Sequence, residues 1–220
     1  MNLDFLKRIT GGLFLLTTEF NGIKNGCIIN NCMEVSTNPS CISISVMKNS
    51  YTNELIEKSK KFAISILNKD VSSEMVKKFE LFSGRKNDKF QNISTVMDKN
   101  NVPYVTKNVS TVISANVISK FDLGTHTLFI AQVIDINDIN NSKPITYDEY
   151  QKNVVLKEKN KASSQHIIGW KCRRCGYVHI GEILPNNFIC PLCGRGKDDF
   201  DPIFKEEIEK YEKTLRIVVY

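Results

Sequence analysis

Two Cys-x-x-Cys-Gly turns lie close together near the C-terminal end of this 220-residue chain. Cys172 and Cys175 form the first pair, Cys190 and Cys193 form the second, and a glycine follows each pair. Such a turn points both sulfurs at one ion, and the tight backbone beyond it favours a residue that tolerates positive φ. Because chance rarely places two of these turns in one short segment, they predict a tetrahedral site with four thiolate ligands.

The four cysteines do not by themselves identify the metal. A tetrahedron of four thiolates suits Zn²⁺ in a structural ribbon, and it suits a single iron or an iron–sulfur centre equally well. A zinc site would only fold this part of the chain, whereas an iron site would carry electrons. His166 and His179 are not expected to be ligands, because four thiolates already satisfy the ion.

Composition places the chain among ordinary globular proteins, with 41% hydrophobic residues and enough length for two unequal domains. No run of eighteen apolar residues and no basic-then-apolar N-terminus is present, so we expect a cytoplasmic protein without a membrane segment. Three further cysteines, Cys27, Cys32 and Cys41, are an odd number for disulfides and are expected to be small buried apolar residues. The formal net charge of +6 is scattered among acids, which argues against a nucleic-acid partner.

Hydrophobic patterning predicts a mainly β fold, a closed antiparallel barrel built from many short strands. Strands are expected on both sides of the Asn21-Gly22 turn, at 42–46, at 62–66, and as a long pair at 112–121 and 127–136. Helices are expected after an N-cap at Ser50 or Thr52, at 71–82 and at 146–156. The domain limits predicted from these patterns are 1–156 for the large domain, 157–165 for a polar linker, 166–204 for the metal domain, and 205–220 for a helical tail that packs on a neighbour.

The strand-to-helix entry at Lys48 to Thr52 has the composition of an anion site. Helix N-termini present unpaired N–H groups and a positive dipole end, which favour a phosphate. Simple capping of the helix without any ligand explains the same residues equally well.

The cysteine segment resembles the rubredoxin family. Cys172 to Tyr177, Leu184-Pro185, Phe188 to Gly194 and Lys197 to Phe200 carry the resemblance, together with aromatic residues at 170, 177, 188 and 200. The resemblance implies one iron held by four cysteines, which shuttles single electrons. Only fourteen residues separate Cys175 from Cys190, so the match is to the shortened type that is fused to other domains.

Residues 1–155 resemble the flavin reductase-like FMN-binding family. The resemblance rests on the order and spacing of short motifs: Thr17-Thr18, Asn25 to Asn31, Val35 to Pro39, Val46 to Thr52, Ser83-Gly84-Arg85 with Asp88-Lys89-Phe90, and Gly124 to Phe129. It implies a split antiparallel β-barrel, usually dimeric, with FMN near the subunit interface. The whole chain is similar to high-molecular-weight rubredoxins, which pass electrons from NADH to flavodiiron proteins that reduce oxygen or nitric oxide.

The flavin reductase resemblance implies two groups of cofactor-binding residues. One group would contact the isoalloxazine ring and ribityl chain: Thr17, Thr18, Asn25, Cys27, Ile28, Asn30 and Asn31. The other would bind the phosphate: Val46, Lys48, Asn49, Ser50 and Thr52. His126 is a candidate beside the flavin or nicotinamide, and Arg85 and Lys89 are expected to reach a phosphate or to be solvated charges.

The resemblances together imply an electron-transfer flavoprotein. NADH or NADPH gives up two electrons as hydride, an iron held by four cysteines accepts one at a time, and a flavin can convert between the two. One alternative is an FMN-dependent flavin or ferric reductase whose cysteines hold a structural zinc. Another is a binding protein without catalytic activity, in which a zinc ribbon contacts protein or nucleic acid.

Overall fold

The computed structural model describes residues 9–155 and 167–204, which belong to two separate compact units. The predicted linker and the predicted C-terminal helix lie outside the described residues. Within the described residues, the larger unit has nine strands: β1 (Phe14–Phe20), β2 (Ile23–Ile29), β3 (Cys32–Thr37), β4 (Ser40–Met47), β5 (Lys61–Leu67), β6 (Val96–Met97), β7 (Pro103–Tyr104), β8 (Val109–Asp122) and β9 (His126–Asp138). Its helices are α1 (Tyr51–Ser59), α2 (Ser73–Leu81), α3 (Tyr147–Tyr150) and the π-helical turn η2 (Gln151–Val155). The prediction of a mainly β fold is confirmed.

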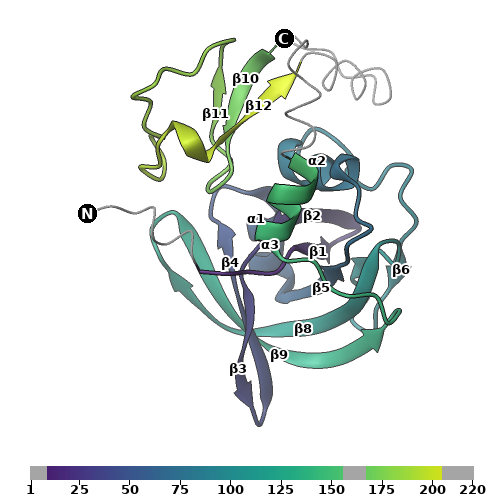
Figure 1. Ribbon diagram of the computed structural model, residues 1–220. Coiled ribbons are helices and arrows are strands. Elements are labelled where there is room, and N and C mark those ends of the chain that lie inside the picture. Colours follow the sequence, from purple (N-terminus) through teal and green to yellow (C-terminus); the bar gives the residue numbers. More distant parts are fainter. Residues whose placement is uncertain (1–8, 156–166, 205–220) are drawn as a thin grey trace. The chain divides into compact units, whose positions relative to one another are not determined.

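Seven of these strands form one antiparallel sheet in the order β2-β1-β5-β8-β9-β4-β3 (Figure 1). The β1–β2 hairpin turns at Asn21 and Gly22, whose φ angles of 52° and 80° are those that a two-residue hairpin turn favours. The long predicted pair is also present as β8 and β9, which run antiparallel. The sequence therefore placed the main strands correctly.

The sheet must curl, because its two edge strands are joined by a very short connection. A flat sheet of seven strands would hold its edges about 29 Å apart, at about 4.8 Å per gap. Only Asn30 and Asn31 separate the end of β2 from the start of β3, and three peptide steps span at most about 11 Å. The two edges therefore approach each other, as the predicted barrel requires.

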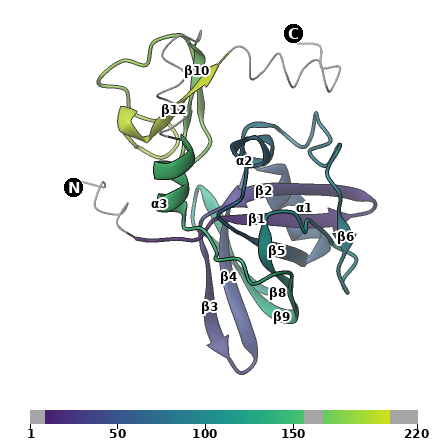
Figure 2. The ribbon, with the colours of Figure 1, turned by 45° about the vertical axis from the view of Figure 1, so that its right-hand side comes forward.

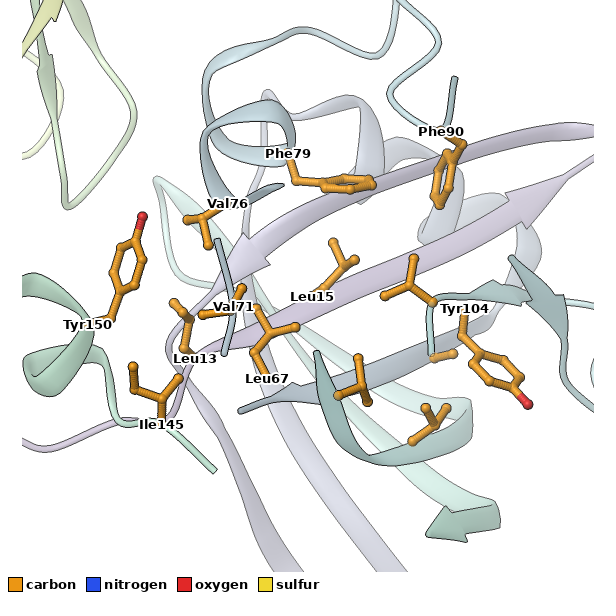
Figure 3. Close-up of a cluster of buried hydrophobic side chains, with 14 of the residues drawn as sticks. Leu13, Leu15, Leu67, Val71, Val76, Phe79, Phe90, Tyr104, Ile145 and Tyr150 are labelled. Carbon is orange, nitrogen blue, oxygen red and sulfur yellow. The ribbon is translucent and has the colours of Figure 1, made fainter. Parts of the chain in front are cut away.

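Apolar side chains fill both faces of the curled sheet. The inner cluster combines residues from strands far apart in sheet order, among them Ile29 of β2, Ile44 of β4 and Phe62 of β5. The outer cluster lies under α2, α3 and the 83–108 segment, and Figure 3 shows Val76 and Phe79 of α2 on the same side as Leu13, which precedes β1, and Leu15 of β1. Alternate residues of β1 thus point to different cores, which decides where each polar side chain of that strand lies.

The helices begin at the residues that cap them. Ser50 accepts a hydrogen bond from the Asn53 N–H at the start of α1, and Ser72 accepts one from the Met75 N–H at the start of α2. Thr146 and Glu149 form a capping box at α3, but α3 covers only four residues before the chain continues as η2. None of the helices in the described part of the chain is long and apolar enough to cross a membrane.

The smaller unit is a three-stranded antiparallel sheet of order β11-β10-β12, visible in Figure 2 as the green-to-yellow part. Its elements are β10 (Ile167–Cys172), β11 (Val178–Ile180), the short 3₁₀ helix η3 (Lys197–Asp199) and β12 (Phe200–Phe204). Tyr177, Phe188 and Phe200 form an aromatic core, with the Phe188 and Phe200 ring centroids 5.3 Å apart and edge to face. So small a sheet has little else to bury, which makes a metal site valuable to its stability.

Candidate functional site

The two Cys-x-x-Cys turns of the smaller unit have the same backbone geometry. The Gly176 N–H donates to the Cys172 carbonyl at 2.9 Å, and the Gly194 N–H donates to the Cys190 carbonyl at 2.9 Å. Both glycines have positive φ, 75° and 70°, which explains why each turn ends in glycine. The two turns are therefore equivalent in backbone geometry.

Their four sulfur atoms converge on one point. All four Sγ atoms lie within 4.8 Å of one another, with 3.6 Å between Cys172 and Cys193 and 3.3 Å between Cys175 and Cys190. Around a tetrahedral ion with bonds of about 2.3 Å to sulfur, neighbouring sulfur atoms lie about 3.8 Å apart. The predicted ligand set therefore fits a tetrahedral metal ion, and His179 lies instead against the Phe188 ring at 4.7 Å.

Hydrogen bonds and burial act on these thiols in opposite directions. The pKa of Cys172 is lowered to about 5, chiefly by its hydrogen bond with the Cys175 side chain, against burial and with help from the N–H groups of Cys175 and Arg174. Burial raises the pKa of Cys193 to about 11. Backbone N–H groups directed at sulfur also stabilise negative charge in a metal–thiolate site, which makes them a means of tuning a redox potential.

One side of the cysteine site is open to solvent. Cys172, Cys175 and Cys190 are buried and Cys193 is half-buried. The neighbouring Ile189 and Leu192 side chains are 60% and 45% exposed. An ion held here would therefore lie closest to solvent at the Cys193 side.

In the larger unit, several of the predicted cofactor residues lie around the first turn of α1. Thr52 and Asn53 in that turn are buried, and the Asn53 amide donates to the Val46 carbonyl at 3.2 Å. Val46 itself is buried in the inner cluster. Ser50, the N-cap, joins this turn to the end of β4.

Asn25 of β2 reaches the same turn from the other side. Its Nδ2 donates to Thr52 Oγ1 at 3.2 Å, and the side chain is 2% exposed. Its Oδ1 has no hydrogen-bond partner among the described residues. A buried acceptor without a donor costs free energy, so it is a natural place for a ligand N–H or O–H group.

Other predicted residues are held by the protein's own backbone. Thr18 donates to the Lys61 carbonyl at 2.8 Å and lies 3.0 Å from Ser59 Oγ, while Thr17 donates to the Ala63 carbonyl at 3.4 Å. Thr17 lies two residues after Leu15 on β1 and so points to the same face, and Ile28 packs against the outer cluster. Both residues therefore belong to the helix-covered face. Thr18, Asn25 and Cys27 belong to the inner face with Leu16.

The remaining predicted residues lie where β2, β4 and the β8–β9 hairpin end. Lys48 pairs with Asp122 at 2.6 Å, its N–H donates to the Thr125 carbonyl, and His126 Nδ1 lies 2.9 Å from Thr125 Oγ1. His126 of β9 is the register partner of Met47, the last residue of β4, and α1 begins shortly after Met47. Asn31 Oδ1 accepts from the Ser45 N–H at 2.8 Å, whereas Asn49 is exposed and Asn30 is half-buried between β2 and β3.

The 83–90 segment contains contacts that the sequence did not reveal. Arg85 pairs with Glu54 of α1 at 2.6 Å, and its guanidinium carbon lies 4.6 Å from the Tyr51 ring centroid. Lys89 is 6% exposed and donates to the Gly26 and Phe79 carbonyls, both at 2.9 Å. The Lys89 side chain is thus not a solvated charge; it ties β2 to α2.

Comparison with known proteins agrees with this division into two units. The family model described as "Flavin reductase like domain" matches residues 6–154. The chain belongs to the flavin reductase-like family. A second model, described as "Rubrerythrin, rubredoxin-like domain", matches residues 170–201, which include all four cysteines.

Named relatives match this flavin reductase-like chain either along most of its length or over about two thirds of it. It is 28% identical to the high molecular weight rubredoxin of Moorella thermoacetica, over 92% of this chain and 100% of that protein. It is 29% identical to the ferric-chelate reductase (NAD(P)H) of Archaeoglobus fulgidus, over 68% of this chain and 89% of that protein. Among solved structures, flavin reductase PheA2 matches with a TM-score of 0.56 and 27% identity, over 66% of this chain and 93% of that one.

Both implied cofactors fit this flavin reductase-like chain. The four convergent sulfurs fit an iron, and the Asn25 acceptor beside the first turn of α1 fits a ligand that carries both an anion and an N–H or O–H donor. Its fusion of a flavin reductase domain with a rubredoxin-like domain indicates flavin-linked electron transfer.

Proposed function

We propose that this protein is an NAD(P)H-dependent oxidoreductase that passes electrons from NADH or NADPH through FMN to an iron held by four cysteines, and from the iron to a partner protein. The observation that carries the proposal is the convergence of four thiolates in a chain whose larger part is a flavin reductase domain. The match to a high molecular weight rubredoxin along 92% of the chain supports it. No general acid or base is needed, because hydride and electron transfer depend on positioning and redox tuning.

The residues of the larger unit would bind and orient FMN, which when bound supplies the conversion of a hydride into single electrons. The first turn of α1, capped by Ser50, would hold the phosphate at its positive end. Asn25 Oδ1 would accept a hydrogen bond from the ring or ribityl chain. Cys27 and Thr18, on the same inner face, would border the ring, and His126 would lie at the outer end of this site.

The residues of the smaller unit would hold the iron and set its potential. Cys172, Cys175, Cys190 and Cys193 would be the ligands, with backbone N–H groups directed at the sulfurs. The Tyr177, Phe188 and Phe200 rings pack against one another in the same unit, with Phe200 buried. The exposed side at Cys193 would be where electrons leave for the acceptor.

The acceptor in this proposal is a flavodiiron-type oxygen or nitric oxide reductase, and the protein acts in the cytoplasm, where thiolates stay reduced. We also propose a homodimer. The strand β3 supports this, because its large apolar side chains Met33 and Val35 are 65% and 46% exposed and a second subunit would cover them.

A second candidate is an FMN-dependent flavin or ferric reductase in which the cysteines hold structural zinc. The match to the ferric-chelate reductase favours it. The match of 150 residues covers 89% of that protein, so that protein is little larger than the flavin unit. Metal identity separates the two candidates.

The test is a visible absorption spectrum of anaerobically purified protein, with metal analysis of the same sample, before and after NADH is added. Flavin bands together with thiolate–iron charge-transfer bands, both bleaching with NADH, are expected. Flavin with stoichiometric zinc, even after expression with ample iron, would favour the second candidate. If the purified protein contains neither flavin nor iron, the remaining candidate is a binding protein without redox activity.

A further inference from the structure

Three consecutive residues, Ser83, Gly84 and Arg85, lie across the buried amide of Asn25, and we call them the strap. A Cβ atom at Gly84 would lie 2.1 Å from Asn25 Oδ1 and 2.8 Å from Nδ2. Only glycine therefore permits this close approach, and the need is for space and not for an unusual backbone angle. The strap covers the one acceptor atom of the α1 site that lacks a partner among the described residues.

The covered amide belongs to the site and not to the strap. Asn25 is 2% exposed, and its Nδ2 is bonded to Thr52 in the first turn of α1. Because Oδ1 receives no donor from the strap or from any other described residue, covering it leaves an unpaired acceptor in the interior. A ligand that supplies this donor must first displace the strap.

Arg85 holds the strap in place through two contacts, both to the first turn of α1. Its guanidinium pairs with Glu54 at 2.6 Å and lies over the Tyr51 ring at 4.6 Å. The Arg85 and Glu54 side chains are 50% and 34% exposed, so the contacts are at the surface, where they can break and re-form. Glu54 keeps a second partner, Lys58, at 2.7 Å, so its carboxylate stays paired when Arg85 leaves.

We propose that the strap is a cover over the α1 site, that Arg85 is its latch, and that the cover must open before the flavin phosphate and ring can enter. The inference rests on the proposed function, because it takes FMN as the ligand of this site. Arg85 acts here through Glu54 and Tyr51 and is a positioning residue, not a catalytic one. Breaking the latch lowers the barrier to opening, so it speeds entry of the ligand, whereas departure starts from the displaced strap and does not depend on the latch.

The first experiment measures FMN association with flavin-free protein by stopped-flow fluorescence, and dissociation by displacement. In Arg85→Ala, the association rate constant is expected to rise about fivefold, which corresponds to about 1 kcal/mol, while the dissociation rate constant stays unchanged. Lys58→Ala is the matched control, since it removes an ion pair of similar length from the same Glu54 carboxylate without touching the strap. Its rate constants are expected to equal those of the wild type. Slower association in Arg85→Ala would overturn the latch, because it would mean that Arg85 binds the phosphate directly.

A second measurement does not depend on flavin. In hydrogen–deuterium exchange of the ligand-free protein, peptides covering residues 83–88 are expected to exchange faster in Arg85→Ala than in the wild type or in Lys58→Ala. Unchanged exchange in Arg85→Ala would overturn the latch whether or not flavin binds. A wild type that binds no FMN, with faster exchange in Arg85→Ala, would instead overturn the proposed ligand while the latch stands.

Discussion

Asn25 gives the most direct test of the flavin site at the scale of one residue. In Asn25→Ala, the ligand loses an acceptor and Thr52 loses a donor, so we expect the dissociation constant for FMN to rise about tenfold or more, from a hydrogen bond worth about 1.5 kcal/mol. The measurement is a fluorescence titration with FMN, with urea unfolding on the same protein.

Ser65→Ala is the control for that substitution. Ser65 is also buried, and its hydroxyl has no partner among the described residues, but it lies on β5 opposite Leu15, on the helix-covered face. Its removal is expected to leave FMN affinity unchanged. An equal loss of affinity in both variants would mean that the effect comes from general destabilisation and not from the site.

Cys193 tests the metal centre in the same way. In Cys193→Ser, the tetrahedral thiolate set loses one ligand, so we expect bound iron per chain to fall and the thiolate–iron absorption to disappear or shift. Cys41→Ala is the control, because Cys41 is buried in β4 of the larger unit and is no member of the four-sulfur cluster. Iron retained with an unchanged spectrum in Cys193→Ser would contradict the assignment of this sulfur as a ligand.

At the scale of elements, two helices with matched caps separate stability from binding. Ser50 caps α1 and Ser72 caps α2, with hydrogen bonds of 3.1 and 3.2 Å to the third residue beyond each cap. Each change to alanine is expected to lower the free energy of unfolding by about 1 kcal/mol, measured in urea.

Only Ser50→Ala is expected to weaken FMN binding as well, because the first turn of α1 would hold the phosphate whereas α2 covers the outer core. If Ser72→Ala weakens binding to the same extent, α1 has no special part in the site. FMN binding to the Ser50→Ala and Ser72→Ala variants is to be measured by titration at a temperature where each variant is fully folded.

The elements were largely predictable, because alternation and turn residues are local properties. Ile42, Ile44 and Val46 alternate with serines, and Asn21-Gly22 allows the positive φ angles of a tight hairpin turn, so β4 and the β1–β2 hairpin follow from the sequence. The helix expected over 146–156 was less well predicted: a capping box starts it, but the α-helical part ends at Tyr150.

The cysteine site was predictable down to its ligands, while the flavin site was not. Cys-x-x-Cys-Gly encodes its own geometry within a few residues, as the paired glycines show. By contrast, the flavin residues come from β2, β4, α1 and β9, and their meeting depends on the curl of the sheet. The contact of Lys89 with Gly26 and the contact of Gly84 with Asn25 each join residues about sixty positions apart in the sequence. No local sequence pattern predicts such contacts.

At the scale of the whole molecule, the segment at 157–164 joins the proposed flavin site to the proposed iron site within one chain. Tethering makes an encounter intramolecular, with an effective concentration on the order of millimolar for a short connection. In the intact protein, the rate at which iron is reduced after NADH reduces the flavin is therefore expected to be independent of protein concentration.

Cutting this segment should change the order of that reaction. With a specific protease site introduced between residues 157 and 164, the cleaved protein is expected to show iron reduction that slows in proportion to dilution, while NADH still reduces the flavin at the original rate. The same protease added to the protein without the site is the control. A rate that stays fast and independent of concentration after cleavage would mean that contacts between the two units, and not the tether, bring the flavin and the iron together.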